Sequence, residues 1–210
     1  MDYNLNYNDT PIKAKKRNEI LNKSINIFIR EGIGKLKMRD IAKECDISLR
    51  SLYYYYSNKE DLAIDLQIKC MSSFTDVINK INIDKKVDYN QFCKYLDNMY
   101  NIIIEKEKEI KFITAFDYYF YNSYPNEKYS TFLKTALTDN FIFKKEYKID
   151  FESINFHDED PNTFLITIIQ SFLAYAQKII YREKAMLSEN IKSKGELRIF
   201  VKIIKEAIKL

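Results

Sequence analysis

Residues 38–59 restrict the fold of this chain more than any other stretch, because they read as two short helices joined by a tight turn. The first helix has apolar residues at helical spacing, which gives it one buried face: Met38, Ile41, Ala42 and Cys45. Ala42 is small where a second helix must cross closely. The pattern therefore predicts a compact pair of helices and excludes a strand over this stretch.

The turn and the second helix follow directly. Asp46 tolerates the left-handed backbone conformation better than most residues other than glycine, and Ser48 suits the N-cap of a helix over residues 49–56. That helix turns Leu52 and Tyr56 inward. Two helices with a turn of three or four residues form a helix-turn-helix, whose second helix fits the major groove of DNA.

Over residues 16–62 the sequence resembles the TetR/AcrR-type transcriptional repressors. The family's characteristic residues occur in the usual order and spacing: Ile20-Leu21, Phe28, Gly32, Ile41-Ala42, Ile47-Ser48, Leu52-Tyr53, Tyr56 and Lys59-Glu60-Asp61-Leu62. The departures are Asp46 for the usual turn glycine, Lys37 for the usual cap, Arg50 for a common glycine, and Tyr55-Tyr56 for the frequent His-Phe pair. Arg50 and Tyr55 lie on the reading face, so these departures affect the operator sequence and not the act of binding.

The chain is expected to be all-α, with an N-terminal three-helix helix-turn-helix domain and a larger C-terminal helical domain for ligand binding and dimerisation, about nine helices in total. Three glycines and three prolines in 210 residues favour long helices over a turn-rich β fold. The predicted division is a mobile tail over 1–12, the DNA-binding domain over 13–56, a linking helix over 57–80, and an effector-binding and dimerisation domain over 81–210.

Helix boundaries are marked by capping residues. The first helix is expected over residues 13–30, with Gly32 as its stop. Capping-box motifs, in which Ser or Asp is followed three residues later by Glu or Gln, predict helix starts at Ser57, Asp88 and Ser193. Two further helices are expected over 126–140 and 160–184. Residues 141–160 show no clear period and are interpreted as a loop, or as a loop that contains a short helix.

Positive charge is concentrated on the part that carries the motif. Residues 1–59 hold twelve Lys and Arg against seven Asp and Glu, a balance of +5 within a chain whose net charge is +4. Phosphate binding requires such a concentration. The basic run over residues 13–17 is either a solvated face or an arm that contacts phosphate or the minor groove.

The resemblance implies particular DNA contacts. Arg39 matches a position that reaches a base edge, and arginine favours guanine; Arg50 and Ser51 are the main base-reading candidates. Tyrosine hydroxyls reach phosphates, or the rings pack on thymine methyl groups, although these tyrosines also fit ordinary surface aromatics. Lys59 is expected to hold a phosphate at a helix N-terminus. The full predicted set is Arg39, Ser48, Arg50, Ser51, Tyr53, Tyr54, Tyr55 and Lys59.

The resemblance also implies an effector pocket in the C-terminal part. Its candidate lining consists of aromatic and apolar residues, with Asp117 and Gln170 as polar groups inside apolar stripes: Tyr95, Met99, Phe112, Phe116, Asp117, Tyr119, Phe120, Gln170 and Phe172. Aromatic residues at helical spacing fit an ordinary core equally well. The expected ligand is an apolar or aromatic small molecule.

Residues 164–176 are apolar nearly all round the helix, which indicates burial on several sides and therefore a partner subunit. Together with the last helix they are expected to form half of a four-helix dimer interface: Ser171, Ala174, Leu197, Phe200, Val201 and Ile204. A homodimer presents two recognition helices, which suits a palindromic operator with half-sites about 34–36 Å apart, or a multiple of this.

Other classes of protein lack the necessary residues. One histidine, no glycine-rich phosphate loop and no nucleophile paired with a base exclude catalytic residues, metal sites and cofactors. Cys45, Cys70 and Cys93 fit buried thiols in a reducing compartment. The polar N-terminus and the interrupted apolar runs favour a cytoplasmic protein with no membrane contact.

The expected function is therefore a homodimeric repressor that binds a palindromic operator on double-stranded DNA and is released by a small-molecule effector. The alternative is a structural, nucleoid-type DNA-binding protein that responds to no ligand, or a module that docks a protein. A repressor binds few sites and loses them when its effector is added, whereas a structural protein binds many.

Overall fold

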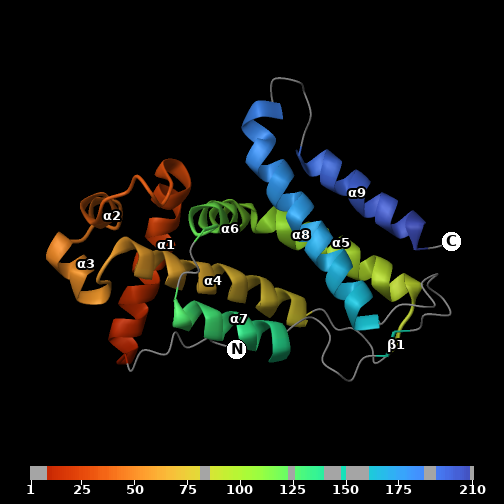
Figure 1. Ribbon diagram of the computed structural model, residues 1–210, viewed down its shortest axis with the longest axis horizontal. Coiled ribbons are helices and arrows are strands. Elements are labelled where there is room, and N and C mark those ends of the chain that lie inside the picture. The colour runs from red at the N-terminus through yellow and green to blue at the C-terminus, as the bar shows by residue number, and fades with distance from the viewer. Residues whose placement is uncertain are drawn as a thin grey trace. The chain divides into compact units, whose positions relative to one another are not determined.

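The computed structural model describes residues 9–80, 86–122, 126–139, 148–149, 161–186 and 193–208, and helices dominate them (Figure 1). Within these ranges nine helices occur, together with a two-residue parallel pairing of β1 (Lys86–Val87) with β2 (Lys148–Ile149). The predicted all-α class, with a helix-turn-helix and a second helical part, is confirmed.

The chain divides into two compact units. Unit 1 contains Met1–Ser73 and Lys111–Thr135, and unit 2 contains Phe74–Ile110 and Ala136–Leu210. Residues 111–135 thus group with the helix-turn-helix, whereas the sequence analysis assigned them to the C-terminal part. The functional division into 13–56, 57–80 and 81–210 stays a prediction.

Unit 1 is built from helices that pack around the helix-turn-helix: α1 (Pro11–Glu31), α2 (Met38–Glu44), α3 (Leu49–Tyr55), the first two thirds of α4 (Lys59–Lys80), and most of α6 (Glu107–Tyr119) and α7 (Glu127–Asp139). Helix α1 begins two residues before the predicted start, because Thr10 accepts a hydrogen bond from the Lys13 amide (3.4 Å) and Pro11 has the fixed φ that a first helical residue needs. The predicted tail is therefore shorter than residues 1–12, and residues 1–8 of it fall outside the described ranges.

The end of α1 follows the expected chemistry, whereas the starts of α4 and α9 differ from it, because Ser193 is already the first residue of α9. Gly32 ends α1 with φ of +76°, and its amide donates to the Phe28 carbonyl at 2.9 Å. Helix α4 begins later than its predicted Ser57 cap. The side chain of Asn58 accepts from the Asp61 amide (2.7 Å), because asparagine at that position reaches the exposed amide of the first turn.

The core of unit 1 is apolar and rich in aromatic rings. Phe28 of α1 meets Phe112 of α6 edge to face, with ring centroids 5.7 Å apart, and Phe116 continues the contact to Tyr129 of α7 at 5.3 Å. All four side chains are at most 8% exposed. Their burial joins α1, α6 and α7 in one core.

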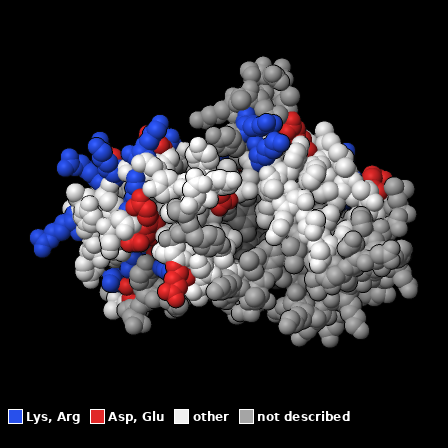
Figure 2. All heavy atoms as spheres, in the orientation of Figure 1, with Lys and Arg blue, Asp and Glu red and all other residues white. Residues whose placement is uncertain are grey.

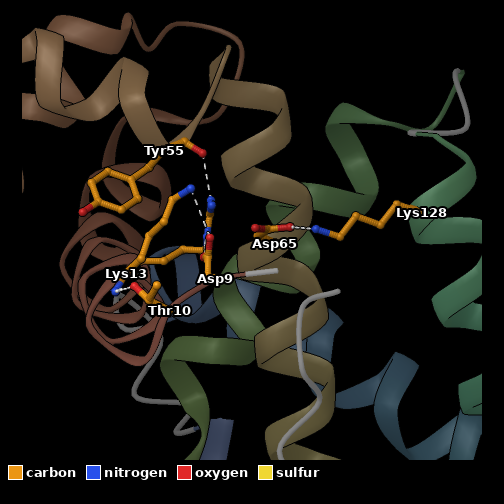
Figure 3. A network of polar contacts seen from close by, with 7 residues as sticks. Asp9, Thr10, Lys13, Tyr55, Asp65 and Lys128 are labelled. Carbon is orange, nitrogen blue, oxygen red and sulfur yellow. Dashed lines mark hydrogen bonds and ion pairs between the residues drawn. The ribbon is translucent and has the colours of Figure 1, made fainter. Parts of the chain in front are cut away.

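A polar contact crosses this core between α4 and α7. The carboxylate of Asp65 is 1% exposed and accepts from the Lys128 ammonium at 2.5 Å (Figure 3). Next to it, the amide of Gln67 donates to the Tyr129 hydroxyl at 3.4 Å. Burial raises the pKa of Asp61, one turn before Asp65, and the charge of Asp65 raises it further. Lys128 is therefore the counter-charge of the buried Asp65.

Unit 2 contains α5 (Tyr89–Glu105), α8 (Pro161–Met186) and α9 (Ser193–Ala207), with α9 packed on both α5 and α8 (Figure 1). The predicted capping box at the start of α5 is confirmed. The Gln91 amide donates to the Asp88 carboxylate at 2.8 Å, and the Gln91 side chain accepts from the Asp88 amide at 3.0 Å.

Aromatic rings also hold unit 2 together. Phe92 lies 5.9 Å from Phe164, and Phe200 of α9 packs between Phe172 (6.1 Å) and Tyr175 (4.5 Å) of α8. Of the three helices, α9 has the sharpest division into an apolar and a polar face. Within the described residues, no helix combines the length and apolar composition that crossing a membrane requires.

We expect Lys128→Ala to lower the free energy of unfolding by about 3 kcal/mol, because it leaves the buried Asp65 carboxylate without its cation. The double variant Asp65→Asn/Lys128→Ala should recover part of this loss, since it removes the buried charge as well. Urea unfolding followed by circular dichroism measures both. Lys16→Ala, which breaks the exposed pair with Glu19, is the control and should leave stability nearly unchanged. Equal losses in the single and double variants would contradict this account.

Candidate DNA interface

The turn between α2 and α3 has the geometry of a helix-turn-helix. Asp46 takes the predicted left-handed conformation with φ of +57°, and the Ile47 amide donates to the Ala42 carbonyl at 3.0 Å. Ser48 caps α3 as expected, because its hydroxyl accepts from the Ser51 amide at 3.0 Å. The hydroxyls of Ser48 and Ser51 also share a hydrogen bond of 2.8 Å. These contacts hold the start of α3 at a fixed angle to α2.

Helix α3 has one buried and one exposed face. Leu52 is fully buried and Tyr56, just past the helix, is 2% exposed, as predicted. Tyr53 and Tyr54 are 51% and 68% exposed, and Arg50 is exposed as well. The outer face of α3 is therefore available to a partner.

A groove of about 350 Å³ lies beside the outer face of α3. Side chains from α1, the turn and α3 line it: Lys16, Ile47, Arg50, Ser51, Tyr54 and Tyr55. Four predicted DNA contacts thus lie together, whereas Tyr53 is not part of the lining. Lys16 belongs to the basic run that the sequence analysis left open, and only the packing of α1 beside α3 brings it to this groove.

Basic side chains gather on the part of unit 1 formed by α1–α3 (left in Figure 2), with acidic ones among them. Arg39, at the start of α2, is exposed as a base-reading role requires. Lys16 pairs with Glu19 at 3.0 Å, and Arg30 pairs with Glu31 (2.9 Å) and Glu44 (3.2 Å). The acidic partners thus moderate the positive charge along α1.

Lys59 has a different position from the one expected of a phosphate contact. Its ammonium donates to the carbonyls of Gly34 (2.9 Å) and Leu36 (3.0 Å), and its side chain is 18% exposed. Two of its three donors therefore hold the loop between α1 and α2 against the start of α4. The lysine side chain is long enough to reach from the start of α4 back to this loop. The spacing of residues in the sequence did not reveal this contact.

The candidate effector residues are distributed over both units. Phe112 and Phe116 are buried in unit 1, where Phe120 is half-buried and Tyr119 is 36% exposed; Tyr95, Met99 and Phe172 are buried in unit 2. The expectation that Asp117 and Gln170 lie inside apolar stripes is wrong, because both side chains are exposed. Asp117 directly follows the buried Phe116. Successive side chains of a helix point in different directions around its axis, so Asp117 lies on the outer face of α6.

The candidate dimer residues also separate into two groups. Ser171 and Ala174 of α8 are exposed, as a contact with a partner requires. On α9, by contrast, Leu197, Val201 and Ile204 are buried and Phe200 is half-buried against α8, so the predicted stripe is the internal core of unit 2. The outer face of α9 carries two residues that the sequence analysis missed: Ile199 and Ile203, 58% and 59% exposed. Their i, i+4 spacing was the available signal.

The three cysteines are thiols and form no disulfide. Cys45 and Cys70 are buried and Cys93 is half-buried. Burial raises the pKa of the Cys45 thiol to about 11, so it stays protonated and unreactive near neutral pH. Among the described residues, no three His, Cys, Asp or Glu side chains form a group able to hold a metal ion. His157 lies outside the described ranges.

Comparison with known proteins agrees with this geometry. Residues 20–66, which include the end of α1, the helix-turn-helix and the start of α4, match the family described as bacterial regulatory proteins, tetR family. The chain is 23% identical over 116 residues to an uncharacterized HTH-type transcriptional regulator from Haemophilus influenzae. That match covers 55% of this chain and 59% of the relative.

Solved structures of similar fold cover nearly the whole chain. A TetR-family transcriptional regulator from Haemophilus influenzae has a TM-score of 0.58 at 17% identity, covering 96% of this chain and all of the other. The fatty acid degradation regulator FadR from Bacillus halodurans has a TM-score of 0.59 at 14% identity, covering 94% and 96%. Together, these findings show that residues 20–66 carry the helix-turn-helix of the bacterial regulatory proteins of the tetR family, and that the chain has the fold of solved TetR-family regulators.

Proposed function

We propose that this protein is a homodimeric transcriptional repressor that binds a palindromic DNA operator and is released by a small-molecule effector. The observation that carries the proposal is the outer face of α3, where Arg50, Ser51, Tyr54 and Tyr55 line one groove together with Lys16 of α1. A capped, exposed helix with donors along one face has the form that reads a major groove.

Each side chain of this face has a role in DNA binding. Arg50 donates to the O6 and N7 atoms of guanine, and Ser51 reaches an adjacent base edge. Tyr54 and Tyr55 give their hydroxyls to phosphates or their rings to thymine methyl groups. Lys16 contacts the phosphate backbone next to the groove, which gives affinity without sequence preference. Arg39 on α2 approaches the flanking base.

Dimerisation is proposed to use the outer faces of α8 and α9. Ser171 and Ala174 are small and exposed, which permits a close approach of two helices, and Ile199 and Ile203 provide apolar surface. A twofold axis through this interface presents two copies of α3 to the two halves of a palindrome. An effector that changes the separation of the two helices weakens binding without touching a base contact.

The proposed effector is an apolar or aromatic molecule that binds in unit 2 near Tyr95, Met99 and Phe172. What supports this is the apolar surroundings of these buried side chains, where Phe92 and Phe164 add further aromatic rings. A regulator of fatty acid degradation shares the fold. An acyl chain is therefore the first class of ligand to examine.

We expect Arg50→Ala to weaken binding to the operator by about 5- to 150-fold, because a bidentate contact with guanine contributes about 1–3 kcal/mol. Fluorescence anisotropy on DNA that flanks the protein's own coding region, with a salt series and nonspecific competitor, measures this. Arg30→Ala removes the same charge outside the groove and should leave discrimination between operator and competitor intact. Equal effects of the two variants, or binding to every sequence alike, would favour the structural DNA-binding protein.

Replacing Ile199 and Ile203 together by glutamate should convert the dimer to a monomer, because two charges would be buried in an apolar contact. Sedimentation velocity ultracentrifugation gives the mass directly. Ile12→Glu alters an isoleucine that is 84% exposed on α1, and should leave the dimer intact. A double variant that remains dimeric would place the interface elsewhere.

Long-chain fatty acids and acyl thioesters should raise the thermal unfolding temperature and release the protein from its operator. Met99→Ala should weaken the ligand's affinity, because it removes buried surface from the proposed lining. Asp117→Asn, on the exposed face of α6, should have no effect. Sensitivity to Asp117→Asn without sensitivity to Met99→Ala would show that the ligand binds outside unit 2.

A further inference from the structure

Arg17 lies in the basic run of α1 and yet is only 4% exposed. One nitrogen of its guanidinium donates to the Asp9 carboxylate at 2.9 Å, and another donates to the backbone carbonyl of Tyr55 at 2.8 Å. The guanidinium carbon also lies 4.9 Å from the ring centroid of Tyr56. Arg17 is therefore enclosed by α3 and by the residue two before the start of α1.

Tyr55 is the last residue of α3, where carbonyl groups have no partner within the helix. A cation at this end satisfies one of these carbonyls and also interacts favourably with the helix dipole. A buried guanidinium needs a counter-ion, and Asp9 provides it with a carboxylate that is only 6% exposed. The hydrogen bond from Arg17 holds the pKa of Asp9 below its usual value.

Asp9 is also linked, through Lys13, to Tyr54, which lines the groove beside Tyr55. Its carboxylate pairs with the Lys13 ammonium at 3.2 Å, and this ammonium lies over the ring of Tyr54, 5.0 Å from its centroid. Tyr54 and Tyr55 meet edge to face at 5.1 Å. In Figure 3, dashed lines mark the pair of Lys13 with Asp9 and the hydrogen bond that the Tyr55 carbonyl accepts. A single carboxylate thus links two cations, each of which contacts one of the tyrosines that line the groove.

We propose that Asp9 and Arg17 are positioning residues for DNA recognition: they set the orientation of the C-terminal half of α3, and with it Tyr54 and Tyr55, without contacting DNA themselves. This inference rests on the proposed DNA binding. It has an unusual consequence, because an acidic residue then increases affinity for a polyanion.

The decisive experiment compares two variants of the full chain that each remove one negative charge beside α1. Asp9→Asn should weaken operator binding about tenfold, although electrostatics alone would strengthen it. Glu19→Gln, which frees the exposed Lys16, should leave binding unchanged or tighter. If both variants bind more tightly than the parent, or if Asp9→Asn binds as well as the parent, the proposal is overturned.

Arg17→Lys is the second variant. It keeps the positive charge but removes the planar guanidinium group, whose nitrogens donate to both the Asp9 carboxylate and the Tyr55 carbonyl. Its binding should fall as in Asp9→Asn, with the same dependence on salt as the parent. A direct phosphate contact gives a different result, because lysine also binds phosphate and would keep the affinity close to that of the parent. An affinity for the operator close to that of the parent would therefore overturn the positioning role.

Amide hydrogen exchange provides a readout without DNA. Asp9→Asn and Arg17→Lys should speed exchange over residues 49–56 and leave the other helices of unit 1 as in the parent, whereas Glu19→Gln should not change it. Faster exchange in this segment supports positioning even if the parent binds no operator, an outcome that would reject only the proposed function. Unchanged exchange over 49–56 in both variants would overturn the inference itself.

Discussion

Burial of one face of α1 is the interaction on which unit 1 depends. Phe28 and Ile20 are at most 1% exposed, and around them pack the helix-turn-helix, α4 and, through Phe112, α6. The burial of such side chains contributes about 1.5–3 kcal/mol each. The same helix carries Lys16 and Arg17 on adjacent positions, so the packing that forms the core also determines which cation faces the groove and which is enclosed.

The basic residues near the groove thus serve two purposes. Lys16 lines the groove. By contrast, Arg17 donates to the backbone carbonyl of Tyr55, and Lys59 donates to those of Gly34 and Leu36. A cation on a carbonyl fixes the end of a helix or a loop, which is a geometric role. Helix α3 has only seven residues, and a helix of this length has little stability alone, so such external contacts determine its orientation.

Local patterns were sufficient for much of the fold. The left-handed Asp46, the Ser48 cap and the Asp88–Gln91 box depend on residues within a few positions of each other, and the structure has all three. In α1, however, Ile27 is buried at 4% exposure beside Ile25 and Phe28. Several helices surround α1 and widen its buried face beyond one stripe, which a single-helix pattern does not include.

Spacing, capping and the two faces of one helix are enough to predict the helix-turn-helix, the all-α class and the outward set Arg50, Ser51 and Tyr54. Packing between distant elements is needed to place Lys16 at the groove and Arg17 in the interior, and to direct Lys59 to a loop. Packing also explains why Ile199 and Ile203, and not Leu197 and Val201, form the outer face of α9. The physical reason is that these roles depend on which neighbouring element covers a side chain. Such contacts form between residues tens of positions apart, such as Arg17 and Tyr55, and they produce no periodic pattern in the sequence.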